Sequence, residues 1–130
     1  MIKPIFLTVL CSVSCWAHAE WDVPIAATAD AKYYADSETK RSSVVPSVWI
    51  LADYTQPQHR TDHDPNYMSV KVLNEADCLA GNMRMVSAIY YSLAMGQGDA
   101  QSFSTITTEW NRPAPRSPSA SIFDYLCSKK

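Results

Sequence analysis

One apolar segment, Val44–Tyr54, constrains the fold of this 130-residue chain more than any other feature. Its side chains alternate between two faces: Val48, Ile50, Ala52 and Tyr54 on one, Trp49, Leu51 and Asp53 on the other. A period of two is typical of a β-strand, and because both faces are largely apolar, both should be covered. The segment is therefore predicted to be an interior strand. Pro46 cannot donate a ladder hydrogen bond, so it should lie at the start of this strand or at a bulge.

Five further segments are predicted to be strands. The longest, Asn82–Leu93, also fits a helix, because Met85, Ile89 and Leu93 are four residues apart. Its Val, Ile and Tyr residues favour a pleated surface, so we prefer a strand. The sequence Gly96-Gln97-Gly98 is predicted to be a turn. The other predicted strands, separated by polar or glycine-containing segments, are Trp21–Ala27, Lys32–Ala35, Tyr67–Leu73 and Gln101–Trp110.

A single helix is predicted near the C-terminus, after the extended, proline-rich segment Arg112–Pro118. Ser117 can cap the helix and Pro118 suits its first position, and one apolar stripe follows, made of Ile122, Phe123 and Leu126. Because a helix of about ten residues does not persist alone in water, it should dock on the sheet. Together these elements predict an α+β fold that is mainly β, in one domain.

The first 19 residues have the pattern of a cleavable export signal. Lys3 supplies the positive start, Ile5–Val13 the apolar region and Ala17-His18-Ala19 the cleavage site. We expect the mature protein to be residues 20–130, located in the periplasm or secreted, without a membrane span. Cys15, preceded by the small residue Ser14, offers the alternative of a lipid anchor at the outer membrane.

Cys78 and Cys127 are the only cysteines of the expected mature chain. In an oxidising compartment a disulfide between them is predicted. Closing a loop of about 50 residues would stabilise the fold by about 4 kcal/mol in the chain-entropy model, and would tie the helix to the end of a strand. Two free thiols are the alternative.

The charge and the motifs exclude several classes of function. Loss of Lys3 leaves ten basic and 13 acidic residues, a net charge of −3, and no basic run precedes Lys129-Lys130. Nucleic acid is therefore not an expected partner. The sequence has no nucleophile elbow and no glycine-rich phosphate loop, so we expect neither catalysis nor a cofactor. Asp36 and Glu38 are interpreted as turn and surface residues rather than as an acid–base pair.

Two groups of side chains could bind metal. His59, Asp62, His63 and Asp64 lie within six residues and offer nitrogen and oxygen donors for Zn²⁺ or Cu²⁺, although a solvated hairpin loop would have the same composition. Met83 and Met85 would share a face of a strand and could hold Cu(I), but we prefer the interpretation that they fill the core.

Two tyrosine pairs are candidates for a binding surface. If Tyr33-Tyr34 and Tyr90-Tyr91 lie in strands, each pair places one ring on either side of the sheet. One ring of each pair should then lie at or near the surface, where tyrosine is a common anchor of protein interfaces.

Several short motifs follow one another along almost the whole expected mature chain. They are Tyr33-Tyr34-x-Asp36, Val48-Trp49-x-Leu51-x-Asp53-Tyr54, Ser69-x-Lys71, Asp77-Cys78, Arg84, Tyr91-Ser92-x-x-Met95-Gly96-x-Gly98, Trp110, Pro115-x-Ser117 and Cys127. Their order resembles that of the surface-adhesin protein E family of Gram-negative bacteria. The resemblance implies a single twisted antiparallel sheet of about six strands, with the C-terminal helix tethered to its concave face by a disulfide. It also implies an adhesin that binds host matrix and plasma proteins and tends to dimerise. The chain departs from the family at Arg116, where glycine is usual, and in its poor lipid-anchor signal.

The sequence thus predicts a non-enzymatic, adhesin-like protein-binding module of the cell envelope. Its partner would be a host matrix protein or another envelope protein, and it would form homodimers if it follows the family. The alternative is a periplasmic carrier of a small ligand or metal, which requires open space between the helix and the sheet.

Overall fold

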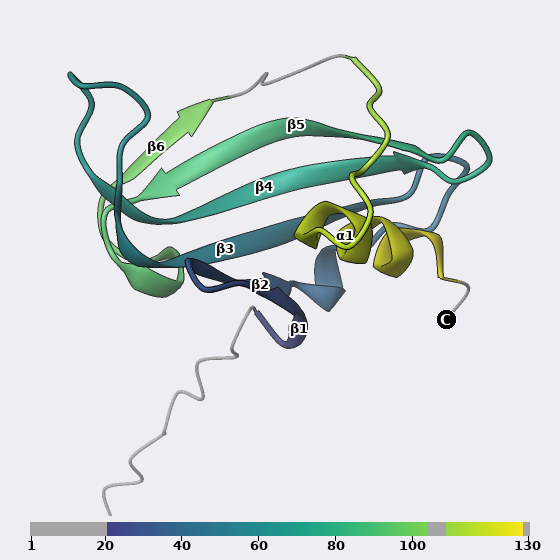
Figure 1. Ribbon diagram of the computed structural model, residues 1–130, viewed down its shortest axis with the longest axis horizontal. Coiled ribbons are helices and arrows are strands. Elements are labelled where there is room, and N and C mark those ends of the chain that lie inside the picture. The colour runs from purple at the N-terminus through teal and green to yellow at the C-terminus, as the bar shows by residue number, and fades with distance from the viewer. Residues whose placement is uncertain (1–20, 104–108, 129–130) are drawn as a thin grey trace, which may run out of the picture.

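The computed structural model describes residues 21–103 and 109–128 and forms one six-stranded sheet with a C-terminal helix (Figure 1). The strands follow one another across the sheet in chain order, and every neighbouring pair is antiparallel. The strands are β1 (Val23–Ala27), β2 (Ala31–Ala35), β3 (Ser47–Gln58), β4 (Tyr67–Asp77), β5 (Asn82–Tyr91) and β6 (Ala100–Phe103). The predicted mainly β architecture is confirmed. The predicted export signal, Met1–Ala19, lies outside the described residues.

Two central strands, β3 and β4, end later in the chain than the sequence pattern predicted. β3 continues beyond Tyr54 to Gln58, and its register with β4 is irregular between Asp53 and Gln58. It begins at Ser47, because Val44 and Val45 lie in an exposed loop. This loop is closed by hydrogen bonds between the Ser43 hydroxyl and the backbone of Val45. Pro46 directly precedes the strand, and its carbonyl accepts a hydrogen bond from the backbone of Ala76.

The segment Asn82–Tyr91 is a strand rather than a helix, as preferred from its β-branched and aromatic residues. Its register against β4 shifts once, between Leu73 and Asn74, which leaves Val86 as the extra residue. The shift keeps Met85 and Ala88 on the same face of the sheet. Met85 and Ile89, whose spacing of four suggested a helix, therefore lie on opposite faces of the sheet.

The last predicted strand, Gln101–Trp110, is only partly described. β6 ends at Phe103, and residues 104–108 lie outside the described part. Trp110 is not in a strand: its ring stacks on the guanidinium of Arg84 at 4.3 Å, and the next residue, Asn111, bridges to Met83 at the edge of β5. The chain then turns toward the face that carries the helix.

The helix α1 (Pro118–Cys127) begins where its capping residues predicted. The hydroxyl of Ser117 accepts a hydrogen bond from the backbone N–H of Ala120, and Pro118 occupies the first turn. The preceding segment is not uniformly extended, because Arg116 has a φ of 57° and lies in a turn. This is the position at which the family usually has glycine, the residue that adopts positive φ without strain.

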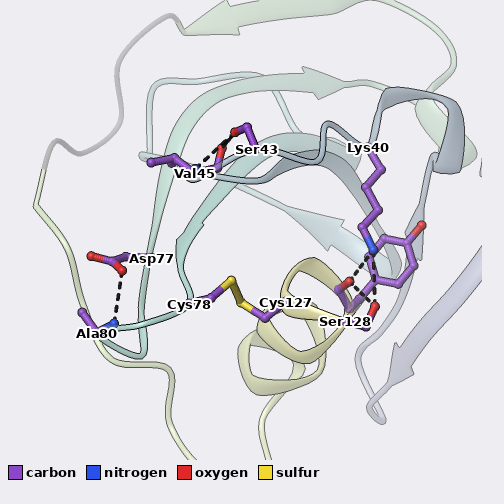
Figure 2. Close-up of a disulfide and its surroundings, with 9 residues drawn as sticks. Lys40, Ser43, Val45, Asp77, Cys78, Ala80, Cys127 and Ser128 are labelled. Carbon is purple, nitrogen blue, oxygen red and sulfur yellow. Dashed lines mark hydrogen bonds between the residues drawn. A yellow bond between two sulfur atoms is a disulfide. The ribbon is translucent and has the colours of Figure 1, made fainter. Parts of the chain in front are cut away.

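A disulfide joins the β4–β5 turn to the end of α1 (Figure 2). The Cα atoms of Cys78 and Cys127 are 5.6 Å apart, a distance typical of such bridges. The turn is tight, since Asp77 accepts a hydrogen bond from the N–H of Ala80 and Gly81 has a φ of 75°. The predicted bridge between sheet and helix is confirmed.

Candidate functional site

The side of the sheet that carries α1, here called the helix face, has two unequal parts. In the first part, Ile122 and Leu126 of α1 are buried against strand residues, of which the largest are Val48, Ile50 and Met83. In the second part, three buried strand residues are packed by the rings of Tyr33, Tyr54, Tyr67 and Tyr90; these three are Ala52, Val70 and Ala88. We call these parts the helix half and the tyrosine half.

The rings of the tyrosine half contact each other edge to face. The ring centroids of Tyr67 and Tyr90 are 4.7 Å apart, and those of Tyr54 and Tyr67 are 5.9 Å apart. Burial, reinforced by the neighbouring tyrosines, raises the pKa of Tyr54 to about 12. Tyr54 is therefore neutral at physiological pH, and its ring closes the core where the helix does not reach.

A cavity of about 410 Å³ lies between the two halves, on the helix face. Its floor is formed by strands β3 to β5, mainly by aliphatic side chains such as Val70, Val72 and Met85. Its wall is formed by the segment 111–114 and by the first turns of α1. The volume lies within the range of small-ligand pockets. Docking of α1 therefore does not fill the space that the carrier alternative requires.

One side chain on the floor of this cavity is both polar and buried. Asn74 is 3% exposed, and its Nδ2 donates a 3.0 Å hydrogen bond to the carbonyl of Val72. Among the described residues, no hydrogen bond reaches its Oδ1. In the described part, every fully buried side-chain oxygen or nitrogen has a hydrogen-bond partner. Because the Asn74 Oδ1 has no such partner, it is not fully buried, and it is open to the cavity that Asn74 lines.

The opposite side of the sheet, here called the outer face, is covered only in part. The loop around the 3₁₀ turn η2 (Ala94–Gly96) lies on it. The hydroxyl of Ser69 donates to the carbonyl of Leu93 and accepts from the N–H of Gly96. Beside this loop, the ammonium of Lys71 lies 5.2 Å from the ring of Trp49 and 6.0 Å from that of Tyr91. The outer face thus carries half-buried aromatic rings and the ammonium group of Lys71, which lies beside two of them.

The four candidate tyrosines divide between the two faces. Tyr33 and Tyr90 pack in the tyrosine half, whereas the pairing of Tyr34 with Leu51 and of Tyr91 with Ser69 places these two on the outer face. All four are half-buried. The structure therefore places Tyr34 and Tyr91 on the outer face, whereas Tyr33 and Tyr90 complete the core.

The candidate metal residues lie in the β3–β4 loop, at the end of the sheet away from α1 (Figure 1). Asp64 is engaged by Arg60 in an ion pair of 3.1 Å, while His59, Asp62 and His63 are exposed. In residues 21–103 and 109–128, no three His, Cys, Asp or Glu side chains come together as a metal site requires. Metal binding by this loop stays a prediction.

The remaining candidates are the methionines Met83 and Met85 and the carboxylate pair Asp36 and Glu38. Met83 is 7% exposed and belongs to the core, whereas Met85 is 45% exposed and lines the cavity. Asp36 caps the 3₁₀ turn η1 (Ser37–Thr39) by accepting a hydrogen bond from the N–H of Glu38. These contacts explain Met83 and Asp36 without metal or acid–base chemistry.

One anchor of the helix had no signal in the sequence. The Lys40 ammonium lies 4.3 Å from the ring centroid of Tyr125 and donates hydrogen bonds to the Tyr125 carbonyl at 2.7 Å and to the Ser128 hydroxyl at 3.3 Å (Figure 2). A cation at this position can donate hydrogen bonds to carbonyls left free at the C-terminal end of a helix, and it interacts favourably with the helix dipole. Because Lys40 and Tyr125 are 85 residues apart in the chain, local patterns could not indicate the contact.

Fold and site together define a small β-sheet protein whose C-terminal helix is bridged to the sheet by a disulfide. The family model for surface-adhesin protein E matches residues 21–128, and the chain belongs to this family. No curated protein matches it. In the residues that the structure describes, no helix is long and apolar enough to cross a membrane.

Solved structures with a similar fold are those of Haemophilus influenzae protein E. Its crystal form II is 13% identical, with a TM-score of 0.61, and the match covers 83% of this chain and 94% of that one. A second structure of the same protein is 13% identical, with a TM-score of 0.59, covering 83% of this chain and 91% of that one. At this identity the likeness establishes the fold.

Proposed function

We propose that this protein is a non-enzymatic, adhesin-like module that binds another protein at the cell envelope through its outer face. Membership of the surface-adhesin family supports the class of function. The observation that carries the choice of surface is the group formed by Trp49, Lys71 and Tyr91, whose rings and cation are half-buried and adjacent. Aromatic anchors of this kind supply most of the energy of many protein interfaces.

The partner is proposed to be a host matrix protein or another envelope protein, met after export to the periplasm or the medium. The helix face is less suited to this role, because α1 covers one half and tyrosine rings close the other. On the outer face, by contrast, Tyr34 and Tyr91 are half-buried and are not covered by α1, while the η2 turn borders the Tyr91 ring at Gly96.

The proposal is tested by measuring the affinity of the oxidised mature protein for immobilised vitronectin and laminin. Tyr34→Ala combined with Lys71→Ala should weaken binding tenfold or more, because truncating anchor residues at an interface costs over 1 kcal/mol each. Arg112→Ala is the control, since it removes an exposed cation from the opposite side of the sheet, where Arg112 lines the cavity of the helix face. If neither glycoprotein binds, or if the control weakens binding as much as the double variant, the proposal is wrong.

A further inference from the structure

The cavity on the helix face combines an apolar floor with two polar groups that have no evident task in the fold. One is the open Oδ1 of the buried Asn74. The other is Arg112, which lines the cavity, is exposed, and takes part in neither of the two ion pairs found among the described residues. An amide oxygen that is open to a cavity can accept a hydrogen bond from a ligand there, and a cation beside apolar surface attracts an anion.

The strand register places these polar groups at the same end of the cavity. Asn74 pairs with Met85 across β4 and β5, and Asn111, the neighbour of Arg112, bridges to Met83 two residues earlier. From this end, aliphatic floor residues continue along the strands through Val72 to Val70. The cavity is therefore polar at this end and mainly apolar along the strands beyond it, where the rings of Tyr33 and Tyr54 also line it.

We propose that this cavity binds a single-chain aliphatic carboxylate that carries a hydroxyl near its head. The carboxylate pairs with Arg112, the hydroxyl donates to the Asn74 Oδ1, and the chain lies over Val72 and Val70. A volume of about 410 Å³ suits a ligand of this size. This site is independent of the protein binding proposed for the outer face, since its residues lie on the other side of the sheet.

The ligand class is tested by calorimetric titration of the oxidised mature protein with 3-hydroxydodecanoate, dodecanoate and dodecyltrimethylammonium, all below their micellar concentrations. We expect saturable one-to-one binding of the hydroxy acid. Dodecanoate should bind about fivefold more weakly, because one neutral hydrogen bond contributes about 1 kcal/mol. The cationic amphiphile should show no saturable binding. Absence of binding by the hydroxy acid, or equal binding of the cation, would overturn the proposal.

Variants locate the site. Arg112→Gln should weaken both carboxylates about tenfold, as expected for loss of a charge-assisted hydrogen bond, whereas Arg116→Gln, an exposed arginine that does not line the cavity, should not. Ser119→Trp, at the exposed rim on α1, should block binding, and Asp124→Trp on the same helix should leave it intact. Unaltered binding by Ser119→Trp contradicts the placement, as does equal loss in both arginine variants.

The hydroxyl contact has its own test. Asn74→Leu keeps the side-chain volume but removes the acceptor, so it should abolish the fivefold preference for 3-hydroxydodecanoate over dodecanoate while plain dodecanoate still binds. Circular dichroism establishes that this variant is folded, and retention of the preference in a folded variant would refute the role of Asn74. If the variant does not fold, the arginine and rim variants still decide the proposal.

Discussion

The two halves of the helix face are made from the same strands but are closed in different ways. In the helix half, a separate element supplies Ile122 and Leu126 and is held by a disulfide at one end. In the tyrosine half, the sheet covers itself, since Tyr54, Tyr67 and Tyr90 come from β3, β4 and β5. One half depends on a long-range tether, and the other on large side chains carried by the strands themselves.

The lengths of the elements explain this division. A ten-residue helix is about 15 Å long, whereas a twelve-residue strand such as β3 extends about 40 Å. The helix therefore cannot cover the full face, and the remainder must be closed by bulky side chains or left open. The tyrosines close most of it, and the cavity lies at the junction, where neither the helix nor the rings fill the space.

The largest expected effect tests the tether of the helix half. Replacing both Cys78 and Cys127 by alanine should lower the free energy of unfolding by about 4 kcal/mol, because the bridge closes a loop between residues 49 positions apart. Urea denaturation of the oxidised wild type and of the double variant measures the difference. Reduction of the wild type serves as the control and should give the same loss. A loss below about 1 kcal/mol would show that packing and Lys40 alone hold the helix.

The sequence indicated the helix half better than the tyrosine half. The cap at Ser117, the apolar stripe and the pairing of the only two cysteines of the mature part are local or compositional signals, and the structure agrees with them. The alternation in β3 also correctly placed Val48 and Ile50 on one face. Patterns of this kind depend on neighbouring residues, so they can be found without knowledge of the register between strands.

The features that were missed depend on contacts between distant residues. The Tyr54–Tyr67–Tyr90 cluster requires the register of three strands, and the Lys40 contact with Tyr125 requires the docked helix. The cavity also follows from the relative lengths of α1 and the strands rather than from any motif. Asn74 carried no signal in the sequence, because a polar residue within a strand is indistinguishable from an exposed one until its burial is known.

A substitution in the turn that precedes α1 should have a smaller effect, and it should stabilise the protein. Arg116 adopts a φ of 57°, which costs a side-chain-bearing residue roughly 1 kcal/mol relative to glycine. Arg116→Gly should therefore raise the free energy of unfolding by about 1 kcal/mol, seen as a rise of about 4 °C in Tm. Arg112→Gly is the matched control: Arg112 has no positive φ, so this change should be neutral or destabilising. A lower Tm for Arg116→Gly would contradict the strain.

A further effect, confined to alkaline pH, concerns the tyrosine half. Because burial raises the pKa of Tyr54 to about 12, folding favours its neutral form. The stabilisation is fully present below about pH 10, the pKa of an exposed tyrosine, and is lost as the pH rises toward 12. Tyr54→Phe cannot ionise, so the variant should lose less stability than the wild type over this interval. Urea denaturation at pH 9.0, 10.5 and 11.5 measures the slopes.

The same substitution in the helix half makes this comparison quantitative. Burial also raises the pKa of Tyr125, and the carboxylates of Asp22 and Asp36, rather than other tyrosine rings, add to the effect. The hydrogen bond from Lys40 goes to the Tyr125 carbonyl and not to its hydroxyl. Tyr125→Phe should therefore change the alkaline slope in the same direction as Tyr54→Phe but by less. Equal slopes for both variants would contradict the larger effect expected at Tyr54 and would mean that the two halves of the helix face respond alike to base.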